Sequence, residues 1–318
     1  MKLFGSTLAK LTRETRVAIL VAVLFALGTI SLDQGWQAAG LAFIIAATAL
    51  AVSFYWFVIR PSRIPSDAVV TFRLAGAIRE DAPRSPLEQL RSRGAATLFD
   101  IRNALEAAAA DSRLKALLVE ISSPGLGLAT AHELHDLLRA VVAAGKRVIA
   151  VLGGDQITLR DYLIACGAGE IVANPDSALM MLGLSAGSLF LTDALNKIGV
   201  QAQTLQWKEY KGAAEMFTRE TMSPELRESL EAVIGDCHTL VTQSIAQARR
   251  ITVERARDLL GGGFISVRTA CANGLIDRSG YVEDVREEIE PDDQPKSRFI
   301  PLGRYLRHLA YMRDGRAG

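Results

Sequence analysis

The stretch "LKALLVEISSPGLGLATAHELHDLLRAVVAAGKRVIAVLGG", residues 114–154, decides the fold class. It opens with an aliphatic run typical of a buried strand, passes through a Ser-Pro-Gly turn into an amphipathic helical stretch, and ends on a second apolar run. A helix between two short apolar runs indicates a right-handed crossover that leaves the two strands parallel. The sequence therefore predicts an α/β fold with a largely parallel sheet.

The same alternation continues on both sides of this stretch. Further strands are predicted at 68–76, 170–175 and 200–207, and further helices at 97–111, 158–169 and 190–199. Beyond Pro224 the pattern is helical throughout, up to a polar and basic C-terminal section. We assign residues 67–290 to one domain and 291–318 to a linker-like basic tail.

Composition excludes several classes of protein. The chain has 318 residues and a formal net charge of +1, so no basic stripe indicates nucleic-acid binding. The cysteines, Cys166, Cys237 and Cys271, are widely spaced and are interpreted as packed thiols. His132 and His135 in "HELH" are one residue too close for a zinc-protease helix. We therefore expect neither a metal nor a cofactor.

Residues 1–66 differ in composition and predict a membrane anchor. A basic N-terminal tail precedes uncharged residues 17–32, and a second apolar stretch covers 40–59. We favour a transmembrane helical hairpin, with a single span as the alternative. Positive charge outside both stretches places both ends on the cytoplasmic side of a bacterial-type inner membrane. If only one stretch spans, the domain lies on the opposite side.

Three loops follow predicted strands, where α/β proteins place their chemistry. In 122–127, Gly125 and Gly127 have the conformational freedom to expose backbone N–H groups to an oxyanion, although such a sequence is also an ordinary turn. In 152–158, Thr158 fits the N-cap of the following helix. The third loop, 207–213, contains Lys211.

Taken together, these motifs resemble the signal peptide peptidase A family over roughly residues 68–290. The resemblance rests on "ALLVEISSPGLG", on "LGGDQITLRDYLIACGAGEIVANP" and above all on "EYKGAAEMFTRETMSPE". It implies a ClpP/crotonase-like fold, peptide substrates, membrane association and an oligomer. In this family Lys211 corresponds to the general base of a Ser/Lys dyad.

A lysine can accept a proton from a hydroxyl only when its surroundings favour the neutral amine, as burial among apolar groups does. Apolar neighbours in the sequence can supply such surroundings: Trp207, Tyr210, Met216 and Phe217. The alternative reading is a solvated loop lysine. Lys208 has no motif behind it and is interpreted as such a surface residue.

The predicted nucleophile loop departs from the family pattern. Thr158 stands at the serine position, with a more hindered hydroxyl, and Leu159 and Arg160 replace two glycines. The chain resembles the lysine-bearing first half of tandem family members, in which the second half contributes the serine. Two hypotheses follow: a peptidase subunit that pairs with a serine-bearing subunit, or a catalytically inactive membrane protein with a scaffolding role.

Overall fold

The computed structural model describes residues 47–48, 64–80, 96–289 and 298–316. It divides into two compact units, Asp67–Phe299 and a smaller one made of Met1–Ser66 with Ile300–Gly318. Apart from 47 and 48, the predicted spans at 17–32 and 40–59 lie outside the described residues. None of the helices in the described ranges combines the length and the apolar character that a bilayer crossing requires.

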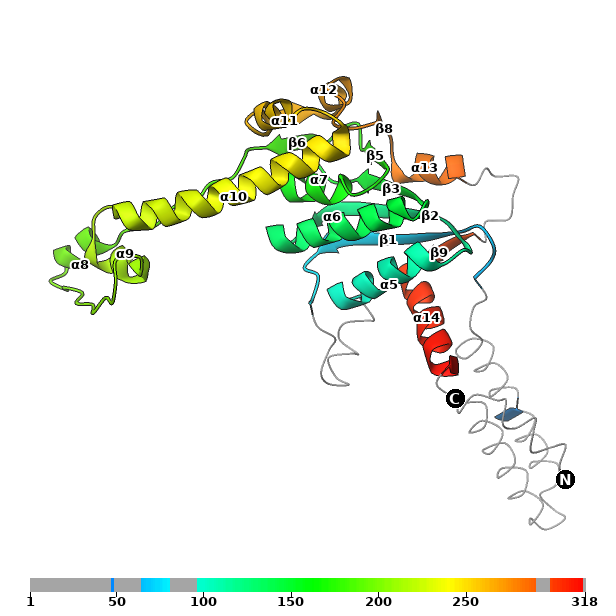
Figure 1. Ribbon diagram of the computed structural model, residues 1–318, viewed down its shortest axis with the longest axis horizontal. Coiled ribbons are helices and arrows are strands. Elements are labelled where there is room, and N and C mark those ends of the chain that lie inside the picture. The colour runs from blue at the N-terminus through cyan, green and yellow to red at the C-terminus, as the bar shows by residue number, and fades with distance from the viewer. Residues whose placement is uncertain (1–46, 49–63, 81–95, 290–297, 317–318) are drawn as a thin grey trace, which may run out of the picture. The chain divides into compact units, whose positions relative to one another are not determined.

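A parallel sheet forms the centre of the larger unit (Figure 1). Its strands run in the order β8-β5-β3-β2-β1, and every neighbouring pair is parallel. Their bounds are Ala68–Gly76 for β1, Leu114–Pro124 for β2, Arg147–Leu152 for β3, Glu170–Ala173 for β5 and Arg278–Ser279 for β8. This arrangement confirms the predicted α/β fold with a largely parallel sheet.

Helices bury both faces of this sheet. On one face, Val285 of α13 (Val282–Ile289) joins a cluster that includes Val69, Leu118 and Ile149. Side chains alternate along a strand, so Leu117 and Val119 point to the other face. Three helices lie in front of that face in Figure 1: α5 (Leu98–Ala110), α6 (Leu128–Ala143) and α7 (Leu159–Ala165). Because both faces are covered, the strands read as nearly continuous apolar runs.

A second, smaller sheet adjoins the nucleophile loop. Its order is β4-β6-β7, with β4 (Gln156–Thr158) parallel and β7 (Gly263–Ser266) antiparallel to β6 (Ala178–Met181). Thr158 is therefore the last residue of β4 and the residue before α7. The remaining elements are α11 (Val253–Leu260), α12 (Val267–Ala272), β9 (Phe299–Pro301) and α14 (Leu302–Arg316).

Residues 182–240 form a projection that we call the arm (Figure 1). It contains α8 (Thr192–Lys197), a 3-10 turn (Gly212–Ala214), α9 (Glu215–Thr218) and the first part of α10 (Pro224–Arg249). The first buried residue of α10 is Val241, so only the last part of this helix packs on the rest of the unit. The arm is thus held at one end.

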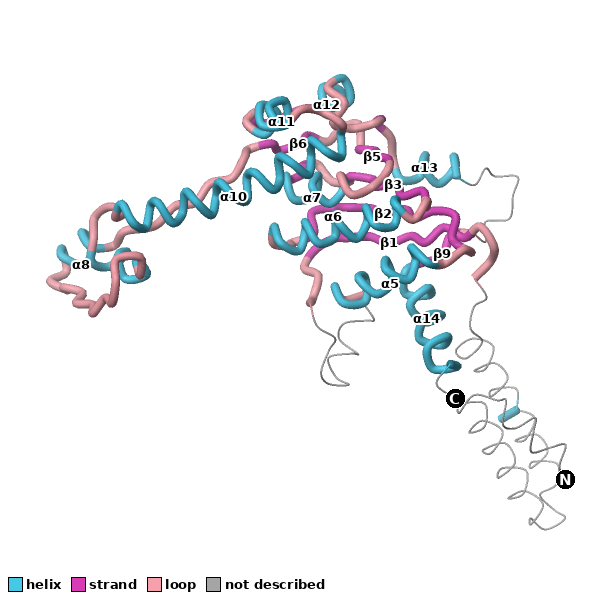
Figure 2. The backbone as a smooth tube through the Cα atoms, in the orientation of Figure 1, coloured by secondary structure: helices cyan, strands magenta, loops and turns pink. Residues whose placement is uncertain are grey.

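Three secondary-structure predictions were wrong. Residues 200–207 form no strand, and Figure 2 shows no strand anywhere in the arm. The region after Pro224 contains β7 and β8, which at four and two residues are too short to show a strand period. The predicted linker-like tail contains β9 and α14, in which Leu302, Tyr305 and His308 are buried at a spacing of three residues.

Candidate functional site

The loops 122–127 and 152–158 lie side by side at the carboxyl ends of the parallel strands. The Gly153 N–H donates a hydrogen bond of 2.8 Å to the Ile121 carbonyl, at the end of β2. The Gly125 N–H donates one of 2.9 Å to the Gly76 carbonyl, at the end of β1. The structure therefore joins these two loops at the sheet edge where α/β proteins bind their ligands.

Neither glycine predicted for an oxyanion-binding turn uses a positive φ. Gly127 has φ −70° and forms the N-cap of α6, and the positive φ of this turn, 47°, belongs to Ser123. The Gly125 N–H is engaged by Gly76, so it is not open to a ligand in this structure. An oxyanion role for Gly125 or Gly127 stays a prediction, and for Gly125 it would require this bond to rearrange.

The structure places Thr158 at the N-cap of α7. Its hydroxyl accepts a hydrogen bond of 3.3 Å from the Asp161 N–H, and its own N–H donates one of 2.9 Å to Asp161 Oδ2. This is a capping box, and the Thr-x-x-Asp spacing in the sequence could have identified Asp161. Burial raises the pKa of Asp161, even though the hydrogen bonds from Thr158 act in the opposite direction.

The chain contains a second capping box with the same chemistry. Thr97 caps α5, its hydroxyl accepts a bond of 3.2 Å from the Asp100 N–H, and its N–H donates one of 2.9 Å to Asp100 Oδ2. No catalytic motif surrounds Thr97. The contacts of Thr158 are therefore the same as those of Thr97, which is an ordinary helix cap in this protein.

This pair yields a direct test. We expect Thr158→Ala and Thr97→Ala each to lower the free energy of unfolding by about 1 kcal/mol, because each removes one side-chain cap. Denaturant titration measures both. A loss of peptidase activity with Thr158→Ala alone, at matched stability, would show instead that the Thr158 hydroxyl is a nucleophile.

Arg160 connects the two loops. Its guanidinium Nη1 donates a hydrogen bond of 3.0 Å to the Leu126 carbonyl, in the turn before α6. In the family that the chain resembles, a glycine stands at the position of Arg160. A long side chain that bridges the loops leaves less room for a peptide backbone than a glycine would, so the loop pair of this chain is poorly shaped for substrate.

Lys211 lies in the arm and is exposed to solvent. Across the described ranges, no side chain forms a hydrogen bond or ion pair with its Nζ atom. The neighbours expected to bury it are themselves exposed, Trp207 at 77% and Tyr210 at 60%. Tyr210 instead donates a hydrogen bond of 3.0 Å to Glu228 of α10. A single chain thus does not supply the apolar surroundings that a basic lysine requires.

A buried polar contact holds the segment after Lys211. The Glu215 carboxylate accepts hydrogen bonds from the Ser223 hydroxyl at 2.5 Å and the Ser223 N–H at 3.0 Å, and both residues are buried. The Ser223 hydroxyl bond, followed by the Ser223 N–H, lowers the pKa of Glu215. A Cβ on Gly212 would meet Glu215 Oε1 at 3.1 Å. Glu215 and Gly212 therefore set the turn in which Lys211 stands.

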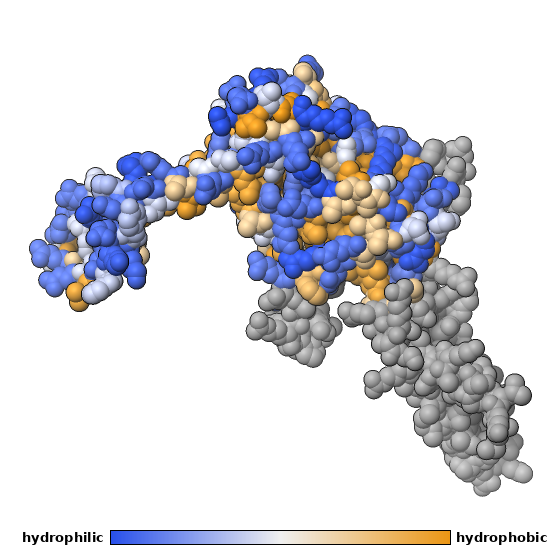
Figure 3. All heavy atoms as spheres, in the orientation of Figure 1, coloured by the Kyte–Doolittle hydropathy of each residue, from blue (hydrophilic) through white to orange (hydrophobic). Residues whose placement is uncertain are grey.

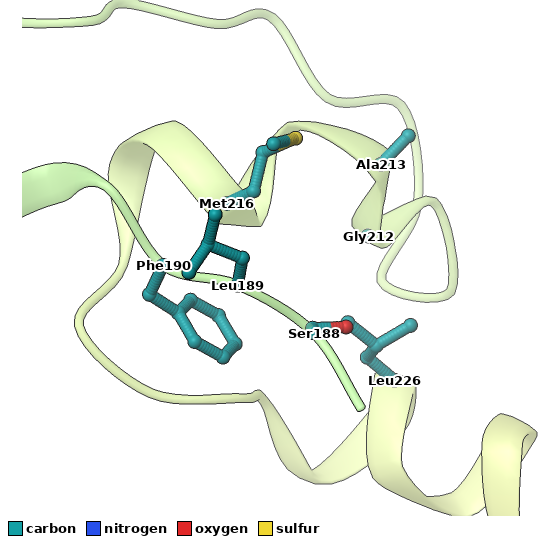
Figure 4. A pocket seen from close by; sticks show the side chains of 7 residues that line it. All are labelled: Ser188, Leu189, Phe190, Gly212, Ala213, Met216 and Leu226. Atoms are coloured by element: carbon teal, nitrogen blue, oxygen red, sulfur yellow. The ribbon is translucent and has the colours of Figure 1, made fainter. Parts of the chain in front are cut away.

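An apolar pocket of about 310 Å³ lies next to this turn (Figure 4). Gly212 and Ala213, which directly follow Lys211, form part of its wall. Apolar side chains from three segments of the arm form most of the rest, and they are Leu189, Phe190, Met216 and Leu226, together with Ser188. The pocket has the size and lining to hold one apolar side chain beside the lysine.

The structure does not bring Lys211 and Thr158 together within one chain. The turn of Lys211 packs near Leu226 at the start of α10, whereas α7 contacts the same helix in its later part. From Leu226 to Val241 the helix rises over fifteen residues, which is about 22 Å. This length of helix lies between the turn of Lys211 and the part of α10 that packs on the core, so we infer no direct proton transfer between Lys211 and Thr158 of one chain.

The described histidines and cysteines are not brought together into one site either. His135 is buried, with Nδ1 at 3.0 Å from the Leu163 carbonyl, and its ring stacks on that of His132. Burial lowers the pKa of His135, which favours the neutral ring. Cys166 is buried and the other two cysteines are half-buried thiols. Where the structure is described, no group of three acidic, histidine or cysteine side chains could hold a metal ion.

Together these features define an α/β protein with a parallel sheet, paired loops at its carboxyl edge and a lysine on a projecting arm. Residues 140–294 match peptidase family S49. A protein of Synechocystis sp. that carries a protease name is 29% identical over 177 residues, which are 56% of this chain and 62% of that protein. A chloroplastic protein of Arabidopsis thaliana named serine protease SPPA is 22% identical over 225 residues, 70% of this chain and 32% of that protein.

The matched residues, 140–294, are just under half of the chain and are similar to peptidase family S49, in agreement with the resemblance to signal peptide peptidase A. The alignments span less than two thirds of the length of these relatives. Among solved structures, ClpP1 of Listeria monocytogenes is 13% identical, covers 67% of this chain and 92% of that chain, and has a TM-score of 0.40. At that score the match carries no argument, and the ClpP/crotonase-like topology stays a prediction.

Proposed function

We propose that this chain is the lysine-bearing subunit of a membrane-associated Ser/Lys peptidase that degrades signal peptides or other short hydrophobic peptides. One observation carries the proposal: Lys211 stands on an arm that cannot reach the loops of its own chain. A general base must lie within hydrogen-bond reach of its hydroxyl. The hydroxyl must then come from another subunit, which we propose to be a serine-bearing relative, because the Thr158 hydroxyl of a second copy would be engaged in the same helix cap.

The arm itself supports an assembly. Between 182 and 240 only Gly212, Glu215 and Ser223 are buried, and none of them is a large apolar residue. Ten large hydrophobic side chains in this range are exposed: Leu182, Leu189, Ile198, Val200, Leu205, Trp207, Tyr210, Phe217, Val233 and Leu240. In the view of Figure 3 the arm is mostly hydrophilic, with a few apolar residues among the polar ones. Because many large hydrophobic side chains are nevertheless exposed over this short segment, we infer that the arm takes part in an interface.

In the proposed reaction, the neutral amine of Lys211 takes the proton from the partner hydroxyl as its oxygen attacks the scissile carbonyl. Backbone N–H groups of the partner's turn receive the oxyanion. The resulting ammonium returns the proton to the leaving amine, and water then hydrolyses the ester with the same lysine as base. The pocket beside Lys211 would hold an apolar substrate side chain, which fits the hydrophobic peptides proposed here.

Contact with the partner would also provide what the single chain lacks at Lys211. Burial of Trp207 and Tyr210 against another subunit would surround the amine with apolar groups and favour its neutral form. The base would thus become competent only in the assembly. This coupling would keep the separate subunit inactive towards peptides.

The alternative is an inactive membrane protein that keeps the fold as a scaffold. The helix-cap contacts of Thr158 favour this alternative for a lone chain, whereas the pocket and the Glu215 contact at Lys211 favour the peptidase subunit. The side of the membrane on which the domain lies, and whether one or two segments span, are also parts of the proposed function.

We expect the purified full chain alone to hydrolyse an apolar peptide poorly, and a mixture with a serine-bearing homologue from the same genome to be active. The experiment compares the wild-type chain with Thr158→Ala and Lys211→Ala, each alone and mixed. Activity of the mixture that survives Thr158→Ala and disappears with Lys211→Ala supports the proposal. Robust activity of the lone chain that Thr158→Ala abolishes would contradict it, and inactivity of every mixture would favour the scaffold.

A further inference from the structure

Residues 200–207, "VQAQTLQW", have a strand-forming sequence but no strand partner. They contain no proline, no glycine and no charge, and they follow Lys197 and precede Lys208. Segments of this kind have high β propensity and pair readily with other strands when they are exposed. In the structure, 200–207 has no regular secondary structure and is exposed except for the half-buried Ala202.

The backbone of this segment is also free to pair. From 201 to 207, no backbone N–H or C=O is hydrogen-bonded to any residue that the structure describes. The Gln206 side-chain amide donates hydrogen bonds of 3.1 and 3.0 Å to the Lys208 and Glu209 carbonyls, which follow it in the chain. Those two bonds and the turn at Lys208, with φ 73°, end the unpaired stretch. The segment is therefore a bounded stretch of unpaired backbone.

Apolar side chains on both sides of the segment are exposed, and a partner strand would bury them. Leu205 is fully exposed and Trp207 is 77% exposed, while Val200 is exposed at the other end. Alternation places Leu205 and Trp207 on one side of an extended backbone and Val200 and Ala202 on the other. Pairing with another strand would bring apolar neighbours against these side chains.

The length of the segment points to its partner. The end strands β4, β7 and β8 have only two to four residues, so none matches an eight-residue stretch. The outer edge of β1 is already bonded, since the Val69 N–H donates a hydrogen bond of 2.8 Å to the Arg298 carbonyl. The same segment of another copy matches it in full. Because the segment is uncharged, two copies can pair without placing like charges opposite each other.

We propose that residues 200–207 of two copies of this chain pair as antiparallel strands and form an interface between their arms. A pair in which both partners use the same surface closes on itself as a two-fold dimer. This interface does not depend on the peptidase reaction. It would cover Trp207 and leave Tyr210 and the Lys211 turn to the serine-bearing subunit. The test therefore measures the mass of the assembly and the hydrogen exchange of its amides, and it does not use peptidase activity.

The test replaces Thr204, in the middle of the segment, in the full chain in detergent. Thr204→Pro removes a backbone N–H and is incompatible with the interior of a strand, whereas Thr204→Ala keeps the backbone. Residues 200–207 form no strand in the single chain, so both variants should keep the wild-type far-ultraviolet circular dichroism. Light scattering after size-exclusion chromatography then gives the mass of each.

We expect wild type and Thr204→Ala to form dimers or multiples of dimers, and Thr204→Pro to associate at least about tenfold more weakly, since each substitution acts twice in a two-fold interface. Hydrogen exchange should show amides 201–206 protected in the assembly and unprotected after dilution to monomer. A monomeric wild type, assembly of Thr204→Pro at wild-type affinity, or fast exchange in the assembly would each overturn the proposal. Protection that is independent of concentration would overturn it too, because the partner strand would then lie within the chain.

Discussion

Replacement of Lys211 by alanine is expected to abolish the peptidase activity of the assembled enzyme, with kcat/KM reduced by at least about 100-fold. A positioned general base contributes a factor of this size, and the contact of Glu215 with Ser223 holds the segment that follows Lys211. The assay uses the active mixture and an apolar peptide. The arm should keep its fold, because the exposed Lys211 side chain forms no hydrogen bond or ion pair with the described residues that the substitution could break.

Lys208→Ala is the matched control for this prediction. Lys208 is exposed, belongs to the same arm and lies three residues earlier, so it tests whether positive charge near the turn matters by itself. We expect it to change kcat/KM by less than about threefold. Lys211→Arg should be as inactive as Lys211→Ala, because a guanidinium does not give up its proton. Activity in Lys211→Arg would mean that the side chain acts through charge and not as a base.

Replacement of Asp277 by alanine is expected to be the largest stability change among the substitutions considered for this protein. Arg249, at the end of α10, makes two bonds to the Asp277 carboxylate at 3.0 and 2.7 Å and a third to the Gly274 carbonyl at 2.8 Å. The same carboxylate accepts a bond of 2.7 Å from the Ile171 N–H of β5. The pair thus ties the base of the arm to the sheet.

Without Asp277, the Arg249 guanidinium would remain mostly buried, at 11% exposure, and without its counter-charge. Removal of one partner from a fully buried pair costs about 3 to 5 kcal/mol. Because the Asp277 side chain is 40% exposed, we expect a smaller loss of unfolding free energy, about 2 kcal/mol. Denaturant titration measures it. Glu231→Ala, which breaks the exposed Arg227–Glu231 pair, should change stability by less than about 0.5 kcal/mol.

The same contact should make stability depend on pH. Burial alone would raise the pKa of Asp277, but the hydrogen bonds from Arg249 and Ile171 outweigh it and lower the pKa below its usual value. The contribution is therefore complete above the unfolded pKa of about 3.9 and is lost as the pH falls through the lower folded pKa. Asp277→Ala should lose this acid-dependent part of the unfolding free energy. An unchanged pH profile would mean that another carboxylate is responsible.

The sequence by itself determined the core of this protein. Apolar runs such as that of β2 and the amphipathic stretch of α6 can be buried in only one way, with strands inside and helices outside, so the parallel sheet was predicted correctly. The helix cap at Thr158 was also predicted from the sequence, and the cap at Thr97 follows from the same pattern. A cap depends on atoms only three residues away in the same chain. Local contacts and strong periodicity determine these features.

Only the tertiary structure decided where Lys211 lies. Its motif identified the residue, but the distance to Thr158 depends on how far α10 extends before Val241 enters the core, and no local pattern encodes that length. Likewise, "VQAQTLQW" has the composition of a strand, yet a strand exists only when another backbone supplies its hydrogen bonds. The single chain supplies none among its described residues, so the residues that matched a strand pattern remain unpaired and without regular secondary structure.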